Sequence, residues 1–239
     1  MNILFDIDDT LYDQKEIFKY AWDKVFADRD DTLIERIFIR SRALSGQTFL
    51  AIQRGELSHD EMYVYRITEA MSENGICISR KQGEDFQAAY LEAQSQIRLS
   101  ETMKSLLDDL KKNGVRLGIL SNGGRSFQRE KIKILGLEQW FDPENIFISE
   151  EIGYEKPDDR AFQFVSDRWQ IKPSEIILVG DAYDHDIVGA ASSGLQTIWM
   201  NRRHYPVPED QLFLPDYIAR SEEELAEILN QVAENEKFI

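Results

Sequence analysis

The sequence has few cysteines and histidines, no long apolar run and a deficit of positive charge. Of its 239 residues, one is cysteine (Cys77) and three are histidine. A single cysteine cannot form an internal disulfide, which fits a reducing compartment. The only early apolar stretch is interrupted by Asp6, Asp8 and Asp9, so we expect no signal peptide and no membrane span. We therefore predict a cytoplasmic protein that does not bind membranes.

The charge balance excludes a second class of partner. Asp and Glu number 44 against 28 Lys and Arg, which gives a formal net charge of −16. Proteins bind nucleic acid through an excess of Lys and Arg, so we expect no nucleic-acid partner. Any phosphate-bearing ligand would need local positive charge. The hydrophobic content of 42% is that of a globular protein, and the length allows one large domain or a domain with an insert.

The first informative stretch lies four residues from the N-terminus. Asn2-Ile3-Leu4-Phe5 is typical of a strand buried on both faces of a parallel sheet, and Asp6 follows at its carboxyl end, where open α/β sheets bind ligands. If the extended backbone continues, Asp6 and Asp8 point the same way. Two carboxylates that close repel unless a cation or a proton lies between them. We therefore take this stretch as the candidate reaction centre; a solvated turn would explain one acid but not three.

The order of predicted elements indicates an α/β fold. Residues 14–97 show helical spacing with no β-rich run, and Ser58-His59-Asp60-Glu61 has the form of a capping box that starts a helix. After residue 98, strands and helices alternate, which predicts a doubly wound parallel sheet with helices on both faces. The predicted strands are residues 2–5, 115–120, 146–148, 176–179, 197–200 and 217–218; the predicted helices between them are 103–110, 125–135, 158–169 and 184–193, with a last helix after 221. We assign 1–13 and 98–239 to the core and 14–97 to an all-helical insert.

Polar residues gather at one rim of this sheet, where four of the strands end. They are Asp6 and Asp8, Ser121-Asn122-Gly123-Gly124, Lys156-Pro157, and Gly180-Asp181 with Asp186. A hydroxyl and free backbone N–H groups at a strand-to-helix turn suit an anion, although one such turn is weak evidence and a lone lysine is more often exposed. Four acids on one rim require a divalent cation, and ligands that are all oxygen suit Mg²⁺.

Three other sites fail on spacing. An EF-hand counted from Asp6 would place Leu11 where glycine is needed. No G-x-G-x-x-G follows a strand, which excludes a Rossmann cofactor site, and Ser121 lacks the G-x-S-x-G turn of a serine hydrolase.

In this order and spacing the four motifs resemble those of the haloacid dehalogenase (HAD) superfamily of phosphatases and phosphotransferases. They are Asp6-Ile7-Asp8-Asp9-Thr10, Ser121-Asn122, Lys156-Pro157 and Gly180-Asp181 with Asp186. The helical insert resembles the C1 cap of that superfamily, a mobile lid that selects the substrate. The resemblance implies a HAD-like Rossmannoid core and a Mg²⁺-dependent phosphomonoester hydrolase. The Asp-x-Asp-Asp-Thr opening, the Ser-Asn-Gly turn and Trp199-Met200-Asn201 further resemble nucleotidase-like and sugar-phosphatase-like members, which implies a nucleoside monophosphate or sugar phosphate as the substrate.

The resemblance also implies a role for each motif residue. Asp6 would attack phosphorus and form an aspartyl-phosphate, and Asp8 would protonate the leaving alcohol and then deprotonate water. The implied Mg²⁺ ligands are the Asp6 carboxylate, the Asp8 backbone carbonyl and Asp181, supported by Asp186. The implied phosphoryl-binding groups are Ser121, Lys156 and the N–H groups near Asn122 and Gly123. Among the arginines of the insert, Arg66 is our candidate for a substrate contact.

Several alternatives stay open. Phosphomutase or phosphonatase chemistry would depend on residues of the cap. Dehalogenases of the superfamily lack an acid at the position of Asp8 and need no metal. Receiver domains gather similar residues but are shorter and have no insert, and a catalytically silent scaffold would not need the complete set. The sequence does not identify the small phosphorylated metabolite or decide between a monomer and a homodimer.

Overall fold

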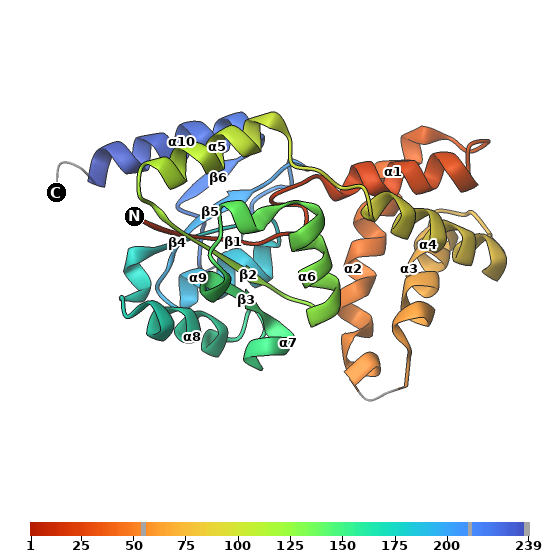
Figure 1. Cartoon of the computed structure of the whole chain (residues 1–239). Coiled ribbons are helices and arrows are strands. Elements are labelled where there is room, and N and C mark those ends of the chain that lie inside the picture. The colour runs from red at the N-terminus through yellow and green to blue at the C-terminus, as the bar shows by residue number, and fades with distance from the viewer. Residues whose placement is uncertain (54–55, 210–211, 237–239) are drawn as a thin grey trace. The chain divides into compact units, whose positions relative to one another are not determined.

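The computed structural model of the protein describes residues 1–53, 56–209 and 212–236 (Figure 1). The chain divides into two compact units. One consists of Met1–Tyr12 and Arg98–Ile239, and the other is Asp13–Ile97.

The first unit is built on a parallel sheet that contains six strands among the described residues. The strands are β1 (Asn2–Phe5), β2 (Arg116–Ser121), β3 (Ile146–Ile148), β4 (Ile176–Gly180), β5 (Gln196–Met200) and β6 (Tyr217–Ala219), in the order β3-β2-β1-β4-β5-β6. Most of their residues are buried apolar side chains, as expected of a sheet covered on both faces. The order reverses beside β1, so β1 and β4 flank the topological switch point where such sheets bind ligands.

Helices cover both faces of this sheet. They are α5 (Glu101–Lys112), α6 (Arg125–Ile134), α7 (Ser149–Ile152), α8 (Asp159–Trp169), α9 (Gly189–Ser192) and α10 (Glu222–Glu236), with the short turns η2 (Leu137–Gln139), η3 (Pro143–Asn145) and η4 (Pro173–Glu175). Figure 1 draws α5 and α10 on one side of the sheet and α8 and α9 on the other. Leu4 and Leu178 pack with Phe162 and Val165 of α8 in one buried cluster.

The predicted helix over 184–193 differs from the observed structure. Its first part is the π-helical turn η5 (Tyr183–Val188), and only Gly189–Ser192 is α-helical. A π turn places more residues in each turn than the 3.6 of an α-helix, and such turns occur often at functional sites.

The second unit is all-helical among its described residues, and consists of α1 (Gln14–Val25), η1 (Asp31–Leu33), α2 (Ile34–Gln53), α3 (His59–Glu73) and α4 (Arg80–Gln94). The capping box at Ser58 is confirmed, because the Ser58 side chain accepts from the Glu61 N–H and Glu61 accepts from the Ser58 N–H. Aromatic side chains fill its core: the Phe18 ring lies 5.4 Å from that of Phe38 and 4.9 Å from that of Phe86.

The predicted fold class, a doubly wound α/β core with an inserted helical unit, is confirmed. In the part of the chain that the structure describes, no helix has both the length and the apolar character needed to cross a membrane.

Candidate active site

The centre of the site is a buried group of charges at the end of β1. Asp6 directly follows this strand and is 7% exposed. Lys156 Nζ lies 2.8 Å from Asp6 Oδ1 and 2.6 Å from Asp186 Oδ1. Lys156 is itself only 2% exposed, so it is not the solvated lysine that its sequence position alone would favour.

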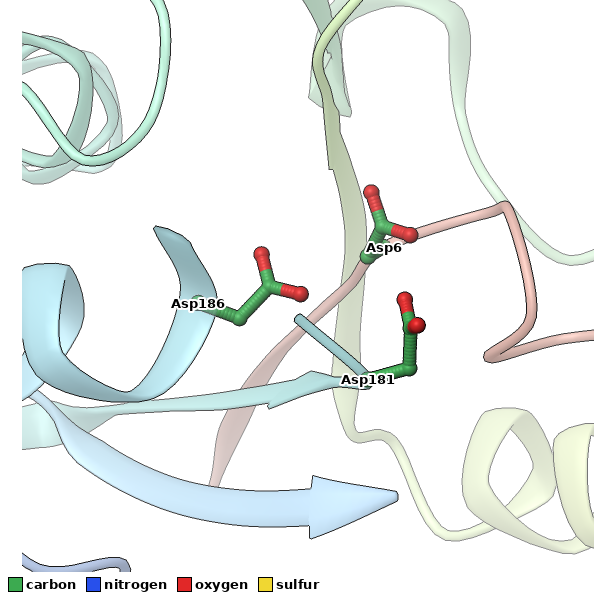
Figure 2. Close-up of side chains that lie close together, drawn as sticks. All are labelled: Asp6, Asp181 and Asp186. Carbon is green, nitrogen blue, oxygen red and sulfur yellow. The ribbon is translucent and has the colours of Figure 1, made fainter. Parts of the chain in front are cut away.

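A third acid completes a possible metal site. Asp6, Asp181 and Asp186 each offer one carboxylate oxygen, and these oxygens lie within 4.8 Å of one another. Figure 2 shows the three side chains gathered beyond the ends of β1 and β4. Three carboxylates facing one ammonium leave two negative charges uncompensated, and a donor set made only of oxygen fits Mg²⁺. The residues present therefore fit the cation that the sequence predicts.

Burial and charge set the protonation of this group. Burial raises the pKa of Asp6 to about 6; the charge of Lys156 opposes this shift, and the charges of Asp186 and Asp8 add to it. Burial alone would lower the pKa of Lys156, but the charges of Asp186 and Asp6 outweigh it and raise the pKa above its usual range. Lys156 is thus a permanent cation beside Asp6.

The backbone after β4 brings Asp181 and Asp186 to the site. A Cβ added to Gly180 would lie 2.4 Å from the Asp186 side chain, so glycine is required there for Asp186 to fold back. Asp186 Oδ2 accepts the Ala182 N–H at 3.0 Å. The indole N–H of Trp199 donates to the Asp181 carbonyl at 2.9 Å, which fixes this segment to β5.

Asp8 has a set of partners different from those of Asp6. Lys131 Nζ lies 2.7 and 2.6 Å from its two carboxylate oxygens. The Tyr12 hydroxyl donates to Oδ1 at 2.5 Å, and the Gln128 amide donates to Oδ2 at 3.1 Å. Asp6 and Asp8 therefore each have a lysine of their own, and a cation bound between the two acids stays a prediction.

The pKa of Asp8 reflects these partners. Burial alone would raise it. The charge of Lys131 and the hydrogen bonds from Lys131, Tyr12 and Gln128 outweigh burial and hold the pKa of Asp8 well below its usual range.

Ser121, the last residue of β2, has the character of a ligand-binding group. Its hydroxyl is buried and finds no hydrogen-bond partner among the described residues. A buried polar group without a partner is rare in folded proteins and needs an explanation, which a bound anion would supply.

Two neighbouring residues have partners within the protein, and a contact of either with substrate stays a prediction. The Gly123 N–H already donates to the Ser149 hydroxyl at 3.0 Å. The Asn122 amide donates to the Lys156 carbonyl at 2.7 Å and accepts the Lys156 N–H at 2.8 Å. The side chain of Asn122 therefore positions the Lys156 segment. His185 Nδ1, which also lies 2.9 Å from the Lys156 carbonyl, adds to this support.

Arg66 lies in the helical unit and binds a residue of the same unit. Its Nε donates to the Ser41 carbonyl at 2.8 Å, and burial lowers its pKa. A contact between Arg66 and a substrate stays a prediction.

Comparison with known proteins identifies the family. The family described as haloacid dehalogenase-like hydrolase matches residues 1–194. The chain belongs to this family of hydrolases.

Individual relatives cover almost the whole hydrolase. It is 30% identical over 230 residues to the HAD-hydrolase YfnB of Bacillus subtilis, covering 95% of this chain and 94% of YfnB. It is 28% identical over 252 residues to the glyceraldehyde 3-phosphate phosphatase of Methanopyrus kandleri, covering 98% of each. The crystal structure of YfnB bound to magnesium superposes with a TM-score of 0.69 at 26% identity, covering 96% of this chain and 98% of YfnB. A dehalogenase structure superposes with a TM-score of 0.74 at 23% identity over 95% of this chain and 96% of its own, a likeness of fold alone.

Two of the residues that surround Asp8 in this hydrolase, Gln128 and Lys131, were not among the predicted site residues. Gln128 and Lys131 are three apart in a predicted helix and so share one side of it, and both are buried. Their spacing relative to Ile132 places both on the apolar side of the helix, which was an available signal, but nothing in the sequence showed which acid they would bind.

Proposed function

We propose that this hydrolase is a Mg²⁺-dependent phosphatase that acts on a small phosphorylated metabolite through an aspartyl-phosphate on Asp6. The observation that carries the proposal is the meeting of Asp6, Asp181 and Asp186 in one small volume beside a buried lysine. The relative from M. kandleri, a glyceraldehyde 3-phosphate phosphatase matched over 98% of its length, supports the same class of reaction.

The metal would be held by Asp6, Asp181 and Asp186, with the Asp8 backbone carbonyl as a further oxygen ligand. When bound, Mg²⁺ would neutralise the phosphoryl oxygens and bring the phosphate group within reach of the acids.

Asp6 would act as the nucleophile. Its carboxylate attacks phosphorus in line, the bond from phosphorus to the ester oxygen breaks, and the alcohol leaves. The Lys156 ammonium, 2.8 Å from Asp6 Oδ1, stabilises the negative charge that spreads over the phosphoryl oxygens. The unpartnered Ser121 hydroxyl donates to one of these oxygens and thereby gains the partner that it lacks among the described residues.

Asp8 would carry the proton in both half-reactions. In the first it must hold a proton, which the negative charge of the bound phosphate favours, and it gives this proton to the leaving ester oxygen; in the second it takes a proton from the water that attacks the aspartyl-phosphate. The substrate class that we propose is a sugar phosphate, as for the glyceraldehyde 3-phosphate phosphatase of M. kandleri, or a nucleoside monophosphate, as the resemblance of the motifs to nucleotidase-like members implies.

Dehalogenation is the alternative that the fold leaves open, since a dehalogenase superposes on this chain. The presence of Asp8 and of three clustered acids argues against it, because displacement of a halide requires no proton donor and no metal. A receiver-like protein would retain its phosphoryl group, and a scaffold would not turn over at all.

The test measures phosphate release from a panel of sugar phosphates and nucleoside monophosphates, with Mg²⁺ and with EDTA. Wild type should turn over only with Mg²⁺, and Asp6→Asn should lose at least about 10³-fold in kcat because the nucleophile is removed. Asp109→Asn, which changes an exposed acid of α5, is the matched control and should keep wild-type activity. Mass spectrometry of acid-quenched wild type should detect the added phosphoryl group on Asp6. Retained activity in Asp6→Asn, or halide release from 2-chloropropionate without phosphate release from any ester, would refute the proposal.

A further inference from the structure

Two buried polar side chains of helix α6 bind Asp8. Lys131 is 8% exposed and Gln128 is 3% exposed, and the two are three residues apart on one side of the helix. Both bind the Asp8 carboxylate, which precedes them by more than 100 residues in the sequence. Burying a lysine is costly unless its charge is matched, so this arrangement exists only because Asp8 is there.

Gln128 is itself held in place from the turn after β2. Its Nε2 donates to Asp8 Oδ2 and also to the Asn122 carbonyl, at 3.0 Å. A Cβ added to Gly123 would lie 2.8 Å from the same nitrogen, so glycine leaves the room that Gln128 needs. The turn that carries Ser121 and Asn122 is thus linked directly to Asp8.

The contacts fix the orientation of the carboxylate as well as its position. Lys131 binds both oxygens, Gln128 binds Oδ2 and Tyr12 binds Oδ1. A carboxylate bound at both oxygens from three side chains cannot rotate about its last torsion without breaking several hydrogen bonds at once.

We propose that Lys131 and Gln128 are positioning residues that aim the Asp8 carboxylate at the ester oxygen of the substrate. The proposal rests on the proposed function, since it gives Asp8 the role of proton donor. Neither residue acts on the phosphoryl group. Each acts through Asp8, and a misplaced proton donor slows only those steps that need a proton.

Two substrates whose leaving groups differ in basicity therefore distinguish a positioning role of Lys131 and Gln128 from a purely structural one. 4-Nitrophenolate leaves readily without a proton, whereas phenolate, which is about 10³ times more basic, depends more on protonation. The ratio kcat/KM reports the step that forms the aspartyl-phosphate, so these two esters compare the same step with and without need of Asp8.

The experiment measures kcat/KM for both esters with wild type, Lys131→Met, Lys131→Arg and Gln128→Leu. We expect Lys131→Met to lower kcat/KM for phenyl phosphate by about 10- to 100-fold and for 4-nitrophenyl phosphate by less than about 3-fold. Lys131→Arg restores a cation that can donate to both carboxylate oxygens of Asp8, so this variant should recover most of the lost kcat/KM. Lys133→Met on the exposed side of α6 is the matched control and should match wild type on both esters.

A double-mutant comparison completes the test. In an Asp8→Asn background, Lys131→Met should cause no further loss on either ester, because its partner has gone. Equal losses on the two esters, a raised kcat/KM for phenyl phosphate, or losses that multiply with those of Asp8→Asn would overturn the proposal. If Lys131→Met does not fold, Gln128→Leu supplies the same comparison without leaving a buried charge, with an expected difference of about 3- to 10-fold between the esters. Asp6→Asn separates the two proposals: full activity in that variant refutes the proposed function, whereas the outcomes above refute the positioning role alone.

Discussion

At the scale of single residues, each of the first two acids depends on its own lysine. Asp6 is paired with Lys156, which comes from the loop before α8, and Asp8 is paired with Lys131 of α6. The two pairs differ in consequence: the pKa of Asp6 is raised to about 6, while that of Asp8 is held below its usual range. Two chemically identical side chains, two positions apart, thus prefer different protonation states because their surroundings differ.

The raised pKa of Asp6 predicts how stability depends on pH in the metal-free protein. Between pH 4 and 6 the unfolded chain releases the Asp6 proton while the folded chain retains it, so folding becomes less favourable as the pH rises. With EDTA present, wild type should lose roughly 3 kcal/mol of unfolding free energy relative to Asp6→Asn over this window and stay level above it. Urea denaturation of both proteins from pH 4 to 8 measures the difference, and a difference that is independent of pH would contradict the assignment.

At the scale of elements, the segment after β1 is held by residues that follow β5. Asp9 adopts a positive φ of 62°, which is uncommon for a residue other than glycine. Its carboxylate binds Arg203 at 2.7 Å, and both side chains are buried. Arg202 donates to the Asp9 and Thr10 carbonyls. Two arginines that follow β5 therefore hold in place the backbone that comes directly after Asp6 and Asp8.

Breaking this buried pair should be costly, because it leaves the Asp9 charge without its arginine. Arg203→Met should lower the unfolding free energy by about 3 to 5 kcal/mol in urea denaturation. The matched control is Arg160→Met, which removes an exposed arginine from its pair with Asp158 and should leave the urea midpoint near that of wild type. Equal midpoints for Arg203→Met and wild type would show that the pair does not hold the segment.

At the scale of the whole molecule, a chain of net charge −16 concentrates acids at the site where we place a phosphate. Asp6, Asp181 and Asp186 repel one another in the metal-free protein, and Lys156 compensates only one of the three charges. A divalent cation that binds the folded state alone should therefore stabilise the protein as well as support catalysis.

Thermal unfolding tests this coupling. Mg²⁺ at 100 times its Kd should add about 2.7 kcal/mol, which for a chain of this size is a rise in Tm of roughly 5 to 11 °C. Asp181→Asn should remove most of the rise, whereas Asp109→Asn should keep it, with NaCl added to match ionic strength throughout. A Tm that does not respond to Mg²⁺ in wild type would argue against the metal site.

Local patterns in the sequence were sufficient for most of the elements, although not for the π turn after β4, and for the rim of the sheet at which the polar residues gather. The apolar run of β1 followed by Asp6, and the glycine turns after later strands, identify where parallel strands end, and chain connectivity then brings those ends to one rim. The capping box at Ser58 is equally local, since its hydrogen bonds join residues three apart. Such features depend on neighbours in the chain, so they can be predicted from one sequence.

Only the tertiary structure decided which charges meet. Whether Lys131 binds Asp8 or faces solvent depends on how α6 rotates against the sheet, and that rotation is set by packing among residues far apart in the chain. The same holds for burial of Lys156 and for the Gly123 N–H, which binds Ser149 rather than remaining available. Ion pairing between distant residues has no local signature, because its energy depends on separation and burial in the folded state rather than on position in the sequence.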